Sequence, residues 1–144
     1  MENSSNVSAD PGHRTYWPMA RAANLDLDLM GRQRVNLLLT GRETLVEDAL
    51  SRVRPGLRGP TQTWTPPGPL LLPSPTQSGT LILRGVEALS DLDQYRLLKW
   101  LDLATGRTQV ISTTTGVLLD LVEAGAFHAA LYYRLNVVCV DLTA

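Results

Sequence analysis

Residues 79–113 read GTLILRGVEALSDLDQYRLLKWLDLATGRTQVIST, and this stretch decides the fold. Thr80–Leu83 is a short apolar run of the kind found in buried strands. Ser90 then precedes a helical pattern, and Asp93 at the third helical position completes a capping box. Residues 109–113 form a second run that is rich in β-branched side chains. A strand, a helix and a strand in this order indicate a parallel βαβ unit.

The sequence on either side continues the alternation. Residues 35–39 (VNLLL) are typical of a strand buried on both faces, and Glu43–Val53 follows with apolar residues at helical spacing. Downstream, three more elements are predicted: a helix over Val117–Ala124 with Gly125 as its C′ residue, a helical Leu131–Leu135, and a last strand within 136–142. The pattern predicts an α/β domain with a mainly parallel sheet of four or five strands.

The helix after Ser90 is expected to bury one apolar face against this sheet. The residues at helical spacing on that face are Leu92, Tyr95, Leu98 and either Leu101 or Asp102, and Leu97 widens the stripe. Gly106 is expected to end the helix.

We divide the chain into an N-terminal arm, residues 1–33, and a folded domain, residues 34–144. The arm is polar and contains Pro and Gly, so we expect it to be partly disordered. The leucines and aspartates that alternate over residues 25–29 are a weak strand signal or an irregular lead-in. Residues 55–78 hold seven of the nine prolines, so only Thr61–Trp64 or Leu70–Leu72 could form a short edge strand there.

The amino-acid composition narrows the range of functions that the protein could have. The 144 residues carry a formal net charge of −1, which argues against a broad nucleic-acid footprint. Lys99 is the only lysine beside twelve arginines. Cys139 lies in an apolar run and is expected to be a buried thiol, and two histidines alone cannot make a metal centre. Without a membrane-spanning stretch or a secretory signal, a cytoplasmic protein is the simplest expectation.

Ligands of parallel α/β sheets bind beyond the carboxyl ends of the strands, so catalytic or ligand-binding residues are expected there. A phosphate-binding loop needs several glycines and a lysine, but only Gly41 separates the first strand from its helix. Arg84 stands where a magnesium enzyme would carry a carboxylate. The threonines at 113–115 are more typical of helix capping than of phosphate binding. A phospho-accepting receiver domain is excluded, since no strand end offers its Asp.

Several blocks of the sequence resemble the central AAA+ domain of sigma-54-dependent bacterial transcription activators, some of which are response regulators. The family reads approximately GTLFLDE, LQ..LLR.L, VIAATN and L..LV..G.FR.DLYYRLNVV. The matching blocks here are 79–85, 94–101, 110–115 and 118–138, the last containing LYYRLNVV. The resemblance covers about residues 34–144. It implies a three-layer, P-loop NTPase-like fold without the helical lid, since the sequence given stops at Ala144.

The sequence departs from the family pattern at the positions that bind and hydrolyse the nucleotide in that family. The phosphate-binding loop is reduced to Gly41, and the Asp-Glu pair that binds magnesium is replaced by Arg84 and Gly85. The polar sensor Asn is Thr115. Of the two arginines that act on a neighbouring subunit's nucleotide, the first is His128 and the second remains as Arg134. The loop that carries GAFTGA and contacts the sigma factor has no counterpart in residues 55–78.

The resemblance therefore implies a module without ATPase activity, cofactor or metal, which acts by binding protein. The expected partner is an intact AAA+ activator subunit or a second copy, contacted through Arg134, His128 or an exposed Trp64. Arg134 could instead form a core-anchoring salt bridge within the YYRLN segment. Trp64 and the run 70–72 could instead fill the gap left by a missing helix. A regulator that binds nucleotide without hydrolysing it, and DNA binding by a patch around 52–58, stay as alternatives.

Overall fold

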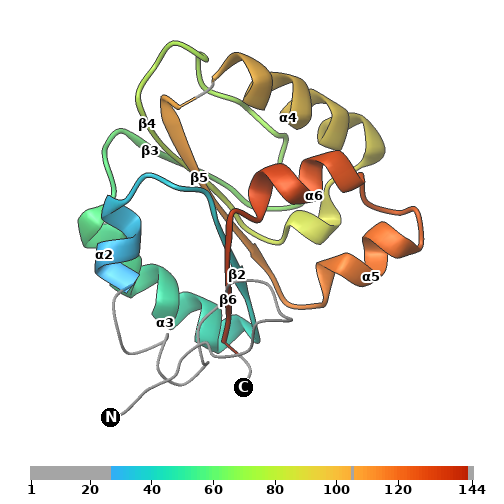
Figure 1. Cartoon of the computed structure of the whole chain (residues 1–144), viewed down its shortest axis with the longest axis horizontal. Coiled ribbons are helices and arrows are strands. Elements are labelled where there is room, and N and C mark those ends of the chain that lie inside the picture. Colours follow the sequence, from blue (N-terminus) through green and yellow to red (C-terminus); the bar gives the residue numbers. More distant parts are fainter. Residues whose placement is uncertain (1–26, 105, 143–144) are drawn as a thin grey trace.

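The computed structural model describes residues 27–104 and 106–142. Within them, one parallel sheet of five strands has the order β3-β4-β5-β2-β6 (Figure 1). The strands are β2 (Leu37–Thr40), β3 (Thr61–Trp64), β4 (Gly79–Leu83), β5 (Thr108–Thr114) and β6 (Val138–Asp141). The predicted α/β class with a parallel sheet is confirmed.

Helices cover both faces of the sheet and make three layers (Figure 1). The helices on one face are α2 (Leu27–Arg32) and α3 (Glu43–Val53), followed by the 3-10 turn η1 (Arg54–Gly56). The helices on the other face are α4 (Asp91–Leu103), α5 (Leu118–Glu123) and α6 (Ala129–Leu135), with the 3-10 turn η2 (Val86–Ala88) before α4. The right-handed geometry of parallel crossovers places helices in this way.

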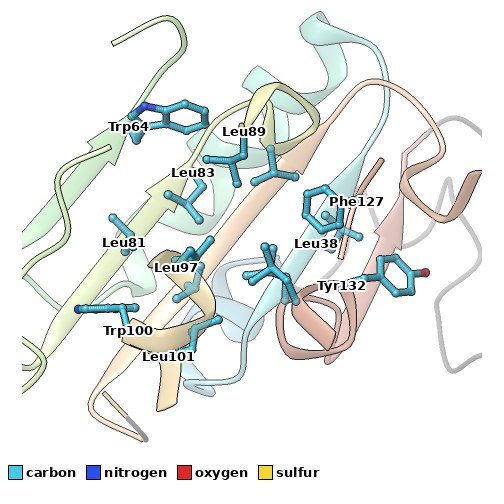
Figure 2. Packing of buried hydrophobic residues seen from close by; sticks show 14 of the residues in the cluster. Leu38, Trp64, Leu81, Leu83, Leu89, Leu97, Trp100, Leu101, Phe127 and Tyr132 are labelled. Carbon is cyan, nitrogen blue, oxygen red and sulfur yellow. The ribbon is translucent and has the colours of Figure 1, made fainter. Parts of the chain in front are cut away.

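Each face of the sheet buries its own apolar core, because side chains alternate along a strand. Leu37 and Leu39 of β2 pack toward α3, while Leu38 packs toward the opposite helices. Figure 2 shows that second core, where Leu38, Leu81 and Leu83 meet side chains of the helices. Cys139 belongs to the same core, which confirms the predicted buried thiol.

The strand and helix predictions are confirmed with small shifts. Helix α3 and strand β3 have the predicted bounds, and the strand predicted at 35–39 begins at Leu37. Ser90 caps α4 by accepting a hydrogen bond from the Asp93 backbone N–H at 3.1 Å. Gly125 follows α5 with a φ of 81°, as expected of a C′ glycine. The run 70–72 forms no strand.

The proline-rich segment between β3 and β4 crosses between parallel strands without a helix. Leu70 at its centre is buried in the core. Side chains from the body donate hydrogen bonds to its carbonyls: Gln62 Nε2 to Leu71 (2.5 Å), Trp64 Nε1 to Gly68 (2.7 Å), Arg96 Nη1 to Leu70 (3.3 Å), Trp100 Nε1 to Pro73 (2.7 Å) and Thr108 Oγ1 to Gln77 (2.9 Å). These bonds satisfy a backbone that has no helix or strand partner of its own.

Two expectations need correction. Residues 27–32, which we placed in the arm, form α2 rather than a strand or irregular lead-in, and Leu27 is buried with the side chains of α3. That part of the arm therefore belongs to the folded domain, and the rest of the arm, residues 1–26, lies outside the described residues. In α4, Leu92 and Tyr95 are exposed rather than buried, and Gln94 lies in the core. Because Gln94 is buried, the face of α4 that packs on the sheet differs from the predicted one.

Candidate functional site

The carboxyl edge of the sheet is closed by backbone contacts at the turn from β2 to α3. The Gly41 N–H donates to the Thr114 carbonyl at 3.1 Å, and the Leu142 N–H donates to the Thr40 carbonyl at 2.7 Å. Gly41 is buried, and a Cβ at this position would lie 2.9 Å from the Leu142 Cβ. Only Arg42 separates Gly41 from the first residue of α3. This turn is short and closely packed, unlike the glycine-rich loops whose backbone amides converge on a phosphate.

Arg84 bridges the same edge from β4. Its guanidinium forms ion pairs with Glu43 and, at 2.5 Å, with Glu47 on the first turns of α3. Strand β5 lies between β4 and β2 in the sheet, so these ion pairs join the end of β4 to the helix that follows a strand two positions away. This side chain is 18% exposed, whereas the two carboxylates are more than half exposed.

The remaining polar groups of this edge bind one another. Gly85 adopts a φ of 71°, which favours glycine, and its N–H donates to Thr113 Oγ1 at 3.1 Å. Thr115 Oγ1 donates to the Glu87 carboxylate at 3.2 Å. Gly85 and Thr115 therefore take part in internal hydrogen bonds at the ends of β4 and β5.

Charged side chains of both signs lie at the carboxyl edge. Arg42 and Arg84 stand beside several carboxylates there: Glu43, Glu47, Glu87 and Asp141. A triphosphate needs cationic and N–H donors that are not already neutralised. Within 27–104 and 106–142, no group of three or more His, Cys, Asp or Glu side chains could hold a metal ion.

Arg134 lies near the amino end of β2, on the helix α6 that packs against α4. Its guanidinium pairs with Asp102 of α4 at 2.5 Å and is 38% exposed. Its backbone carbonyl accepts from Asn36 Nδ2 at 3.0 Å, and Asn36 Oδ1 accepts from the Val110 N–H at 2.8 Å. The salt bridge that we considered within the YYRLN segment instead joins two helices.

His128 is the N-cap residue of α6 and also contacts α4. Its ring Nε2 lies 3.3 Å from the Asp91 carboxylate, and its backbone N–H donates to Gln94 Oε1 at 2.8 Å. The Gln94 amide donates in turn to the carbonyls of Leu89 and Ala126. Gln94 thus fixes the turn between α5 and α6, a role that sequence periodicity could not indicate because the residue is polar.

Trp64 is not an exposed contact residue. It is 7% exposed, packs in the core near Leu83 and Leu89, and donates its indole N–H to the proline-rich segment (Figure 2). The alternative that Trp64 and its neighbours fill the space of a missing helix therefore fits the structure. Leu71 is the one exposed residue of the run 70–72, at 65%.

A cavity of about 190 Å³ lies at the amino ends of β3, β4 and β5, on the edge opposite the expected nucleotide position. Its lining includes Thr61, Ser78, Thr80 and Thr108. Thr80 Oγ1 donates to the Arg58 carbonyl, and Thr108 Oγ1 donates to the Gln77 carbonyl, each at 2.9 Å. These hydroxyls hold the surrounding loops together.

The strand order and the three layers define the α/β, P-loop NTPase-like core of the AAA+ class. Residues 67–144 match the sigma-54 interaction domain model, and the chain belongs to this family. No curated protein matches the chain in sequence. No helix among the described residues is long and apolar enough to cross a membrane.

Solved structures share the fold at low sequence identity. NtrX from Brucella abortus in complex with ADP is 18% identical with a TM-score of 0.62, over 85% of this chain and 35% of that one. Its complex with ATP is 19% identical with a TM-score of 0.57, over 82% and 35% of the two chains. The P-loop NTPase domain of the sigma-54 transport activator from E. coli is 20% identical with a TM-score of 0.54, over 74% and 95%. This chain thus spans about a third of the NtrX chains.

Proposed function

We propose that this protein is a non-catalytic module derived from a sigma-54 activator domain, and that it regulates transcription by binding another protein. One observation carries the proposal: Arg84, at the end of β4, is bound by Glu43 and Glu47 of α3. An activating magnesium ion needs carboxylates at such a strand end, and an arginine repels it. The two glutamates also put negative charge on the helix whose N-terminus would face the phosphates.

The turn at Gly41 supports the proposed loss of phosphate binding. Backbone N–H groups bind phosphate when a glycine-rich loop lets several of them converge. Here the Gly41 N–H is already bonded to Thr114, and the helix begins two residues later. The only lysine, Lys99, lies on α4 beside the Tyr95 ring, 5.7 Å from its centroid, rather than in this turn.

The surface around Arg134 is the proposed contact with an intact activator subunit. Tyr133 precedes Arg134 and Val137 follows it by three residues in the sequence, and these two side chains are 66% and 56% exposed. Arg134 is held by Asp102, which fixes the direction of its side chain, and its guanidinium keeps solvent contact. An exposed arginine between apolar side chains is a frequent centre of protein interfaces. We further propose that the protein acts in the cytoplasm of a bacterial cell.

The test is to add the purified protein to the intact AAA+ domain of a sigma-54 activator from the same organism. We expect a complex in size-exclusion chromatography and a changed rate of ATP hydrolysis by the activator. Tyr133→Asp should weaken the complex at least tenfold, whereas Val117→Asp, an equally exposed position on another surface, should leave it intact. Equal binding by both variants, or no complex, would contradict the proposed contact.

A further inference from the structure

The outward face of α4 carries large apolar side chains in solvent. Leu92, Tyr95 and Leu103 are 67%, 51% and 66% exposed. Leu71 is also exposed, and its neighbours Leu70 and Pro73 accept hydrogen bonds from Arg96 and Trp100 of α4. Patches of this kind on a folded domain commonly mark a contact with another molecule.

The order of residues along this stripe is self-complementary. Leu92, Tyr95, Lys99 and Leu103 follow one another at intervals of three or four residues, so they share one helix face, opposite the buried Leu97 and its neighbours. Read in reverse, the stripe again begins and ends with leucine. Lys99 then takes the place of Tyr95, and Tyr95 takes the place of Lys99. Lys99 already lies 5.7 Å from the Tyr95 ring centroid within the helix.

We infer that α4 binds α4 of a second copy of this chain in antiparallel orientation. This pairing sets Leu92 of each copy against Leu103 of the other, and Tyr95 against Lys99. The ammonium then meets an aromatic face, and the two helix dipoles oppose each other. A parallel pairing would set Lys99 against Lys99, which is why the antiparallel arrangement is favoured.

The charges beside the stripe are compatible with this arrangement. Arg96 flanks it and is neutralised by Asp93 at 2.9 Å, and Asp102 is bound by Arg134. The surface is small, because the 13 residues of α4 span only about 20 Å. An interface below about 800 Å² per copy gives a weak dimer, so we expect a dissociation constant of about 100 µM. This inference does not depend on the function proposed above.

Sedimentation velocity tests the inference at protein concentrations from about 10 µM to about 1 mM, a range that spans the expected dissociation constant. Leu92→Glu adds a negative charge near the N-terminus of α4, and Leu103→Lys adds a positive charge at its C-terminus, so neither charge opposes the helix dipole. Each variant alone should weaken the dimer at least tenfold. Mixing the two variants should restore it, because the introduced charges then oppose each other only in the antiparallel pair. Val117→Glu is the matched control at another exposed apolar position and should dimerise as the parent chain does.

The single lysine gives an independent readout. An amine-reactive cross-linker with a span of about 11 Å should join Lys99 to Lys99, since packed helix axes lie about 8–10 Å apart. Lys99→Arg should lose this cross-link, identified by peptide mass, and still sediment as a dimer. A monomer at every concentration, single variants that dimerise normally, or failure of the mixture to recover would overturn the inference.

Discussion

Arg84 at the end of β4 lies 2.5 Å from the Glu47 carboxylate on α3, the helix that follows β2. Glu43 completes this cluster. In the family pattern the two ends of the cluster are an acidic strand end and a helix that follows the phosphate-binding loop. Here an arginine occupies the strand end, and acidic residues occupy the helix.

The Arg84 cluster should contribute modestly to stability. Arg84→Ala is expected to lower the free energy of unfolding by about 1 kcal/mol in urea titrations, because the carboxylates are largely in water. The double variant Glu43→Gln/Glu47→Gln should lose a similar amount, and combining all three should cost less than the sum. Arg52→Ala breaks the more exposed pair with Asp48 and should cost less than about 0.5 kcal/mol. Additive losses would show that Arg84 and the glutamates do not interact.

Gly41 should resist even the smallest side chain. In Gly41→Ala the new Cβ would lie 2.9 Å from the Leu142 Cβ, so we expect a loss of about 1–3 kcal/mol in thermal or urea unfolding. Gly116→Ala is the control, because no atom lies within 4 Å of its added Cβ. It should change stability by less than about 0.5 kcal/mol. A neutral Gly41→Ala would mean that the turn has room, and the closed-turn argument would lose its basis.

Gln94 should be more important to stability than its polar side chain suggests. Gln94→Leu removes the bonds to the Leu89 and Ala126 carbonyls and to the His128 N–H. We expect a loss of about 2–4 kcal/mol, since partly buried groups are left without partners. Gln77→Leu, at an exposed glutamine, is the control and should be nearly neutral. Hydrogen exchange should show earlier opening of α6 in the Gln94 variant only.

Ser112 should be replaceable by alanine with a gain in stability. Its side chain is fully buried, and its Oγ has no hydrogen-bond partner among the described residues. Ser112→Ala is expected to raise the free energy of unfolding by about 1 kcal/mol. Thr113→Val at the next position removes the acceptor of the Gly85 N–H and should lower it by a similar amount. Destabilisation by Ser112→Ala would show that the hydroxyl has a partner.

Much of the fold could be predicted because its signals are local. The apolar run of β4, the cap at Ser90 and the proline-rich break each follow from a few adjacent residues. Two errors arose where distant residues decide the structure. The segment before Gly31 alternates like a strand, but its packing on α3 makes it a helix. In α4 the buried amide of Gln94 outweighs the apolar pattern of Leu92 and Tyr95, because it satisfies backbone groups of the α5–α6 turn.

The candidate site was predictable in position but not in its contacts. The replaced residues Gly41, Arg84, Gly85 and Thr115 were found from the family pattern, and they lie at one edge of the sheet. The partners of Arg84 are 41 and 37 residues away in the sequence, so no local pattern indicates them. The same holds for Arg134 and Asp102, and for His128 and Asp91.

The most direct test of the central claim is a calorimetric titration of the full chain with magnesium-ATP, alongside an intact sigma-54 activator domain as the positive control. We predict no saturable heat up to a nucleotide concentration of about 1 mM, where a dissociation constant of that size would still be detected. The alternative regulator that binds nucleotide without hydrolysis predicts a clear isotherm. A dissociation constant in the micromolar range, abolished by EDTA, would contradict the account.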